Sequence, residues 1–171
     1  PLCHLSKKVI DKTFTKELCN RLSQVFFCGS YGDPIVHPDF FDILRDFRKK
    51  NPKLWLYIHT NAGVHNTDWW AELAEIINGY GKIDFGIDGL EDTNHLYRRG
   101  VKFETAINNA HAFIRAGGKA QWNWLVFKHN EHQIDQARML SGLLGFEKIL
   151  FRGTGRFLNH STLEEKETWD V

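Results

Sequence analysis

The segment Cys28-Gly29-Ser30-Tyr31-Gly32-Asp33-Pro34 places a carboxylate among glycines, directly after the short apolar run Val25-Phe26-Phe27. Glycine lets a backbone approach a ligand closely and adopt positive φ, and Pro34 stiffens the exit from the turn. A carboxylate at the carboxyl end of a strand stands where α/β folds place their binding and catalytic groups. The segment therefore indicates a ligand-binding loop, with a plain turn as the structural alternative.

Polar side chains also follow the other strand-like runs. These residues are His59, Thr60 and Asn61 after the second run, Asp88-Gly89 after the third, Lys128, His129 and Asn130 after the fourth, which carries Asn123 on its body, and Arg152 after the fifth. Because the carboxyl ends of parallel strands converge, we expect these groups to form one functional rim. Each also has a structural interpretation, since Asp88-Gly89 is a favourable turn pair and Asn61 and Asn130 can cap loops.

The elements that must position these groups alternate along the chain. Apolar, β-branched or aromatic runs typical of strands occur at 24–28, 53–59, 82–88, 120–127 and 147–152. Helical spacing appears over about 12–22, from about 38 to 50, from an N-cap at Thr67 to Ile77, from 103 to a stop at Gly117-Gly118, and from 134 to Gly145. This repeated βα unit predicts parallel strands joined by right-handed crossovers. The pattern fits either an open, doubly wound sheet or part of a barrel.

Composition limits the function classes. With 171 residues, 42% of them hydrophobic, the chain suits one globular domain, and a net charge of +1 argues against a dedicated nucleic-acid surface. The apolar runs are too short to span a membrane, and no secretory signal is visible. Three cysteines, Cys3, Cys19 and Cys28, favour a reducing, cytoplasmic location over a disulfide framework. The chain starts at Pro1 and its only methionine is Met139, so we expect a processed chain or a fragment.

One hypothesis for the rim is a mononuclear metal site. Asp33, His59, Asp88 and His129 would supply hard nitrogen and oxygen ligands from four strand ends, as zinc or manganese hydrolases do. No H-x-H or HExxH element supports this interpretation.

A second interpretation rests on several segments in order. Tyr31-Gly32-Asp33-Pro34 is similar to the Gly-Gly-Glu-Pro element of radical S-adenosylmethionine (radical SAM) enzymes, and His59-Thr60-Asn61-Ala62-Gly63 resembles their Thr-Asn-Gly element. Ile87-Asp88-Gly89-Leu90, followed by Asn94-His95-Leu96-Tyr97-Arg98, resembles their fourth-strand segment, and Arg156-Phe157 also fits. The resemblance spans residues 1–157. It implies a partial (β/α)6 TIM-like barrel with parallel strands and outer helices, followed by a polar tail or further region at 158–171.

The defining CxxxCxxC motif of that family is absent. The chain opens Pro1-Leu2-Cys3, which has the form of the last three motif residues, so the resemblance makes Cys3 the third cysteine ligand of a [4Fe–4S] cluster. The first two cysteines would precede Pro1, and the fragment would be inactive alone. Cys19 and Cys28 are interpreted as packing residues.

The resemblance also implies roles for the rim. The cluster and S-adenosylmethionine would generate a 5′-deoxyadenosyl radical that abstracts hydrogen from an unknown substrate. Gly32 and Asp33, with Pro34 and Asn61 beside them, would hold the methionine ammonium group. Asp is shorter than the Glu of the family, which puts this contact in doubt. Asp88 and Asn123 would bind the ribose, and Arg98, or its neighbour Arg99, would bind the methionine carboxylate.

The same resemblance suggests an oxidoreductase or transferase that depends on a reductant such as flavodoxin or ferredoxin. A peptide or protein substrate is an analogy only. A third hypothesis is a degenerate barrel without catalytic activity.

Overall fold

The computed structural model describes residues 4–29, 32–77 and 79–154. The sheet consists of β1 (Gln24–Phe27), β2 (Trp55–Thr60), β3 (Gly81–Gly86), β4 (Ala120–Leu125) and β5 (Lys148–Arg152). The helices are α1 (Lys7–Thr13), α2 (Lys16–Arg21), α3 (Phe40–Lys50), α4 (Thr67–Ile77), α5 (Asn94–Tyr97), α6 (Phe103–Arg115) and α7 (Ile134–Leu144), with short 3-10 helices η1 (Pro34–Val36) and η2 (Glu131–Gln133). None of the helices in these ranges is long and apolar enough to cross a bilayer.

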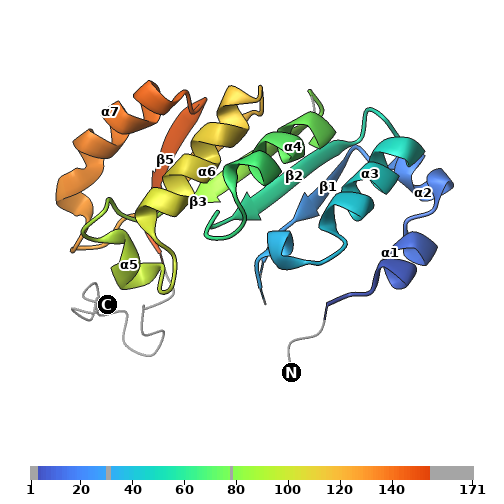
Figure 1. The fold of residues 1–171 in the computed structure, drawn as a ribbon, viewed down its shortest axis with the longest axis horizontal. Helices are drawn as coiled ribbons and strands as arrows, with labels where there is room; N and C mark the ends of the chain where they lie inside the picture. Colours follow the sequence, from blue (N-terminus) through green and yellow to red (C-terminus); the bar gives the residue numbers. More distant parts are fainter. Residues whose placement is uncertain (1–3, 30–31, 78, 155–171) are drawn as a thin grey trace.

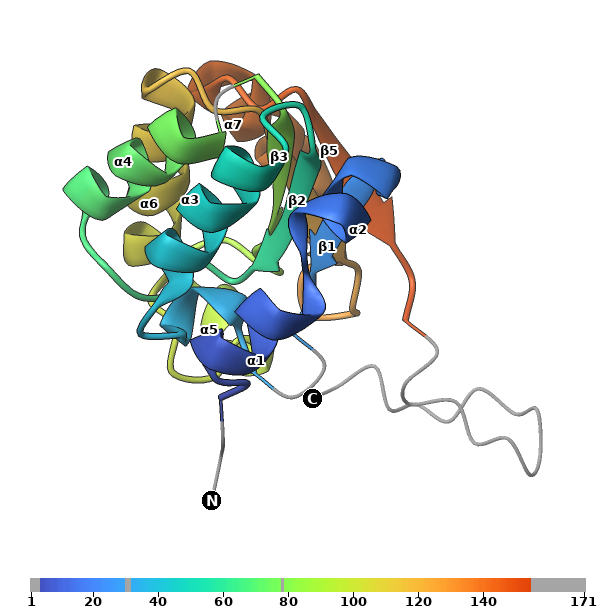
Figure 2. The same ribbon diagram turned by 90° about the vertical axis from the view of Figure 1, so that its right-hand side faces the viewer.

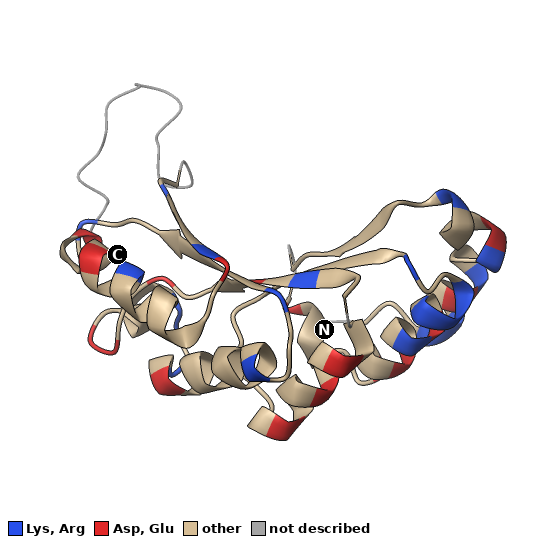
Figure 3. Ribbon diagram, turned by 90° about the horizontal axis from the view of Figure 1, so that it is seen from above, with Lys and Arg blue, Asp and Glu red and all other residues tan. Residues whose placement is uncertain are grey.

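The five strands lie in the order β1-β2-β3-β4-β5, and every neighbouring pair is parallel. Helices α3, α4, α6 and α7 cover one face of the sheet (Figures 1 and 2). Seen from above, the sheet is curved and its helices lie on one side (Figure 3). The predicted α/β fold with parallel strands and outer helices is therefore confirmed. The predicted boundary at residue 157 lies outside the described residues.

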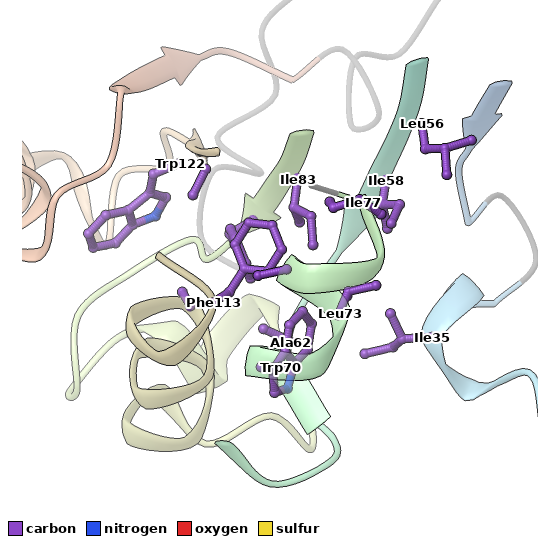
Figure 4. Packing of buried hydrophobic residues seen from close by; sticks show 14 of the residues in the cluster. Ile35, Leu56, Ile58, Ala62, Trp70, Leu73, Ile77, Ile83, Phe113 and Trp122 are labelled. Atoms are coloured by element: carbon purple, nitrogen blue, oxygen red, sulfur yellow. The ribbon is translucent and has the colours of Figure 1, made fainter. Parts of the chain in front are cut away.

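The buried face of the sheet forms the hydrophobic core. Leu56 and Ile58 of β2 and Ile83 of β3 are fully buried, and they pack with Trp70 and Leu73 of α4 (Figure 4). These strand residues alternate with residues of the opposite face, as the period of two in a β-strand requires. Burial of such large side chains stabilises each by roughly 1.5–3 kcal/mol.

The opposite face of the sheet is largely polar at its centre. The register places Phe26 beside Tyr57, His59 beside Asp84, and Gly86 beside Asn123. Because paired residues in parallel strands point to the same face, the side chains of this face meet across four strands, β1 to β4.

Three local predictions were wrong. The single helix expected over 12–22 is two helices, because the chain breaks at Phe14 and the Thr15 side chain then accepts a hydrogen bond from Leu18 N. Asn66, not Thr67, caps α4, since its Oδ1 accepts a hydrogen bond from Trp69 N. The third strand ends at Gly86, so Asp88 lies in the loop beyond it.

Candidate active site

A cavity of about 560 Å³ opens at the carboxyl end of the sheet, as the convergence of strand ends predicts. All the predicted cofactor-binding residues except Pro34 line it. Its wall comprises Cys28, Gly29, Gly32, Asp33, His59, Thr60, Asn61, Asp84, Gly86, Asp88, Arg98, Asn123, Leu125 and Arg152.

Asp33 ties the loop after β1 to the end of β2. Its Oδ2 accepts hydrogen bonds from Thr60 Oγ1 and from Asn61 N, each at 2.8 Å, and its Oδ1 accepts one from Ile35 N at 3.3 Å. The last bond caps η1, whose first residue is Pro34. Pro34 therefore acts on the backbone of the loop, and Asp33 holds two strand ends at a fixed separation.

The loop after β2 is held by a residue that the sequence patterns did not single out. Asn109 of α6 is 2% exposed, and its Nδ2 lies 2.9, 3.2 and 3.3 Å from the carbonyl oxygens of Ala62, Val64 and His65. Ala62 and His65 have φ of 55° and 68°, a region that costs non-glycine residues energy. Asn109 offsets that cost and thereby fixes Asn61 at the cavity wall. The signal in the sequence is an amide on the otherwise apolar face of its helix.

Asp88 and Arg98 form an ion pair in the cavity wall. Arg98 Nε donates to Asp88 Oδ2 at 2.5 Å, while Asp88 Oδ1 accepts from Leu125 N, also at 2.5 Å. The Asp88 side chain is 1% exposed and that of Arg98 is 29% exposed. A Cβ atom on Gly86 would lie 2.5 Å from Arg98 Nη2. The guanidinium group thus lies across a strand position where only glycine leaves enough room.

Two buried asparagines frame this ion pair. Asn94 Oδ1 accepts from Asp88 N, and Asn130 Nδ2 donates to the carbonyl oxygens of Asp88 and Leu125 at 2.8 and 2.9 Å. Neither asparagine has exposed surface. Asn130 therefore has the structural role of joining the ends of β3 and β4, as the alternative interpretation of this residue expected.

Asp84 is the centre of a polar network at the cavity floor. Its Oδ2 accepts hydrogen bonds from Tyr57 Oη at 2.6 Å and Asn123 Nδ2 at 2.7 Å, and lies 3.0 Å from His59 Nε2. Burial disfavours ionisation of Asp84, but the close contact with His59 and the hydrogen bonds from Tyr57 and Asn123 outweigh it, and the pKa of Asp84 is lowered. Burial, followed by the bond to Asp84, raises the pKa of Tyr57. Asp84 therefore remains ionised.

Asp84 was missed as a site residue. The alternation of Lys82, Asp84 and Gly86 with Ile83 and Phe85 marks one polar face of the strand, and that pattern was the available signal.

The proposed mononuclear metal site is wrong. Both carboxylate oxygens of Asp88 are engaged by Arg98 and Leu125, and the ring of His129 stacks on Phe127 and is not part of the cavity wall. In the part of the chain that the structure describes, no three His, Cys, Asp or Glu side chains come together as a metal-binding group.

The cysteines differ in environment. Cys3 lies outside the described residues. Cys19 is buried in α2, as expected for packing, whereas Cys28 is exposed and lines the cavity, so its interpretation as a packing residue was wrong.

Comparison with known proteins adds independent information. The family model of the radical SAM superfamily matches residues 5–140. A search of curated protein sequences finds no match.

Solved structures share the fold. SuiB of Streptococcus suis bound to S-adenosylmethionine superposes with a TM-score of 0.62 at 19% identity, over 76% of this chain and 29% of SuiB. His-tagged anSMEcpe with bound AdoMet superposes with a TM-score of 0.67 at 17% identity, over 86% of this chain and 40% of that protein. A structure of anSMEcpe with AdoMet and the Cp18Cys peptide gives a TM-score of 0.67 at 18% identity, over 86% of this chain and 43% of that protein. The chain thus spans less than half the length of these proteins.

Proposed function

The chain belongs to the radical SAM superfamily, and on this premise we propose that the cavity binds S-adenosylmethionine beside a [4Fe–4S] cluster. When bound, the cluster and this cofactor would supply the chemistry for hydrogen abstraction, a 5′-deoxyadenosyl radical. The remaining task of the protein is to hold these groups in position and to exclude competing reactions. The observation that carries the proposal is that Asp33 and Arg98, an anionic and a cationic side chain, line the same cavity.

The amino-acid end of the cofactor is a zwitterion, and the cavity offers a partner for each charge. On one side, the Asp33 carboxylate and the nearby Gly32 backbone would accept hydrogen bonds from the ammonium group. Asp33 keeps acceptor capacity, because a carboxylate has about four lone-pair sites and three protein donors reach it. On the other side, Arg98 would bind the carboxylate through the guanidinium nitrogens that Asp88 does not use.

The ribose has a candidate partner in Asn123. Its Nδ2 donates to Asp84, and its Oδ1 is buried without a hydrogen-bond partner among the described residues. A ribose hydroxyl would satisfy that oxygen, and an unsatisfied buried acceptor costs about 1–3 kcal/mol. Asp88 has a different role in this proposal, because both of its carboxylate oxygens are engaged, and it orients Arg98.

The cluster would be bound by Cys3 and by cysteines from outside this sequence. Two contacts of the residues that follow Cys3 in the sequence support this part of the proposal. The His4 ring lies 5.2 Å from the His37 ring, and His37 Nε2 lies 2.9 Å from the carbonyl oxygen of Leu5. His37 directly follows η1, the 3-10 helix that Asp33 caps, so the residues after Cys3 contact the loops at this end of the sheet.

A peptide or protein substrate is proposed by analogy, because SuiB has been solved bound to its precursor peptide SuiA, and anSMEcpe with the Cp18Cys peptide. A cytoplasmic location and a low-potential reductant such as flavodoxin or ferredoxin belong to the same proposal, as does the oxidoreductase or transferase class.

The test is anaerobic reconstitution of the full-length protein with iron and sulfide. We expect a brown protein with visible charge-transfer absorption, and dithionite with S-adenosylmethionine should release 5′-deoxyadenosine. The Cys3→Ala variant should lose both signals, whereas Cys19→Ala, which changes a buried packing residue, should keep them if it folds. A full-length protein that folds but stays colourless would support the degenerate barrel instead.

A further inference from the structure

The side of the cavity floor formed by β2 and β3 holds an aspartate–histidine pair that the cofactor assignment does not use. His59 lines the cavity with a side chain that is 39% exposed, and its Nε2 lies 3.0 Å from Oδ2 of the buried Asp84. Nε2 is buried and makes no hydrogen bond of good geometry among the described residues, so the Asp84 carboxylate at 3.0 Å is the group that would accept its proton. With the proton on Nε2, the other nitrogen, Nδ1, is the acceptor of the ring.

The orientation of the His59 ring is fixed from several sides. Phe26 of β1 packs edge-on against it at 4.7 Å, and Tyr57 lies at 5.2 Å with a tilt of 55°. Tyr57, which is also in β2, donates a hydrogen bond to Asp84 Oδ2 and so holds the carboxylate in place. An acceptor oriented by a carboxylate, which is in turn held by further hydrogen bonds, is the arrangement that general bases require.

We propose that His59 is a proton acceptor for the substrate, and that Asp84 is its positioning residue. This inference rests on the proposed function, since it assigns the substrate to the part of the cavity beside the cofactor. The substrate class is one whose reacting carbon bears, or adjoins, a hydroxyl, thiol or ammonium group.

The proton-transfer step is balanced without a further reactant. The bond between the hydrogen and the oxygen, sulfur or nitrogen of the substrate breaks, and its electron pair stays on that atom. A new N–H bond forms at His59 Nδ1. The imidazolium that results is stabilised by the Asp84 carboxylate, which remains unprotonated.

Charged groups of both signs surround His59. The other charged groups in the cavity wall are Asp33, the Asp88–Arg98 pair and Arg152, and the Cys28 thiol lies at the end of β1. Lys82 is on the same sheet face, with its Nζ 4.9 Å from the centre of the Tyr57 ring and 3.2 Å from Gln121 Oε1. Asp84 is the acidic group in direct contact with His59.

The probe is diethyl pyrocarbonate, which acylates unprotonated imidazole nitrogens, read by peptide mass spectrometry on the full-length protein. We expect His59 to react at pH 8, with and without saturating S-adenosylmethionine. The Asp84→Asn variant should shift the neutral His59 ring away from the Nε2–H tautomer, as read by nitrogen-15 NMR, because no carboxylate then accepts that proton. The Tyr57→Phe variant keeps the carboxylate and should keep the wild-type tautomer. His37 and His65, each with a ring nitrogen at a backbone carbonyl, serve as internal references.

Three results would overturn the proposal: an unreactive His59 at pH 8, complete protection by the cofactor, or the same tautomer of His59 in wild type and Asp84→Asn. If that variant does not fold, nitrogen-15 NMR of the wild type decides, since the proposal requires the Nε2–H tautomer of the neutral ring. A separate titration with S-adenosylmethionine tests the proposed function. Absence of cofactor binding would refute that function, whereas the comparison of His59 tautomers would still report on the pair of His59 and Asp84.

Discussion

The Gly86→Ala substitution probes the geometry of the proposed carboxylate site with a single methyl group. The added Cβ would lie 2.5 Å from Arg98 Nη2 and 3.2 Å from Cζ, well inside the optimal separation of about 3.5–4 Å. The guanidinium group must therefore move by roughly 1 Å, which would disrupt the 2.5 Å bond from Nε to Asp88. A hydrogen bond between charged groups contributes about 1.5–3 kcal/mol.

The expected result is weaker binding of S-adenosylmethionine, by about 10- to 150-fold, because each 1.4 kcal/mol corresponds to a factor of ten in the dissociation constant. Isothermal titration of the reconstituted full-length protein measures this change. The matched control is Gly142→Ala in α7, where an added Cβ meets no atom within 4 Å, and affinity should not change. A folded Gly86→Ala protein with wild-type affinity would refute the role of Arg98.

Four further predictions concern binding and stability. Asp33→Ala should weaken cofactor binding while the domain remains folded, and unchanged affinity in titration would remove Asp33 from the site. Arg48→Met should lower the free energy of unfolding in urea by about 1.5–3 kcal/mol. The reason is that the Arg48 guanidinium group donates hydrogen bonds to the carbonyl oxygens of Leu54, Ile76, Ile77 and Tyr80. An unchanged unfolding midpoint would contradict this. Asn109→Ala should cost about 1–3 kcal/mol and make the loop after β2 exchange amide hydrogen faster, whereas unaltered exchange would show that Asn109 does not hold this loop. Since the pKa of Asp84 is lowered from 3.8, the ionised carboxylate contributes to the free energy of unfolding above that pH, and this contribution is lost as the pH falls further. The difference in free energy of unfolding between wild type and Asp84→Asn should therefore shrink below pH 4. A constant difference would contradict the ionised state.

Much of the fold could be predicted from the sequence because hydrophobic periodicity determines it. Ile83 and Phe85 alternate with polar residues, and the helical stripe that includes Phe113 ends near Gly117-Gly118, so strand and helix follow directly from spacing. Strand ends were less certain, since they depend on which backbone groups pair across the sheet. The third strand, for example, ends before Asp88 because that residue turns away to contact Asn94 and Asn130.

The residues that line the cavity could also be predicted, but the hydrogen-bond and ion-pair partners of each side chain could not. Parallel strands bring Asp33, Asp88 and Asn123 to one edge whatever their contacts are. Whether a carboxylate faces a ligand or another protein group depends on distances between strands, which spacing along the chain does not encode. That is why the pairing of Asp88 with Arg98 appeared only in three dimensions. The network of Asp84 was missed for a different reason: the alternation in β3 marks the polar face of the strand, but it does not show that Tyr57 and Asn123 of the neighbouring strands meet at Asp84.

The most direct test of the account is a structure of the reconstituted full-length protein with S-adenosylmethionine bound. The account predicts that the cofactor carboxylate lies within about 3 Å of the Arg98 guanidinium group. It also predicts the ammonium group beside Asp33 and a cluster iron coordinated by Cys3. A cofactor bound elsewhere, or bound here with its amino-acid end away from Arg98 and Asp33, would contradict the central claim.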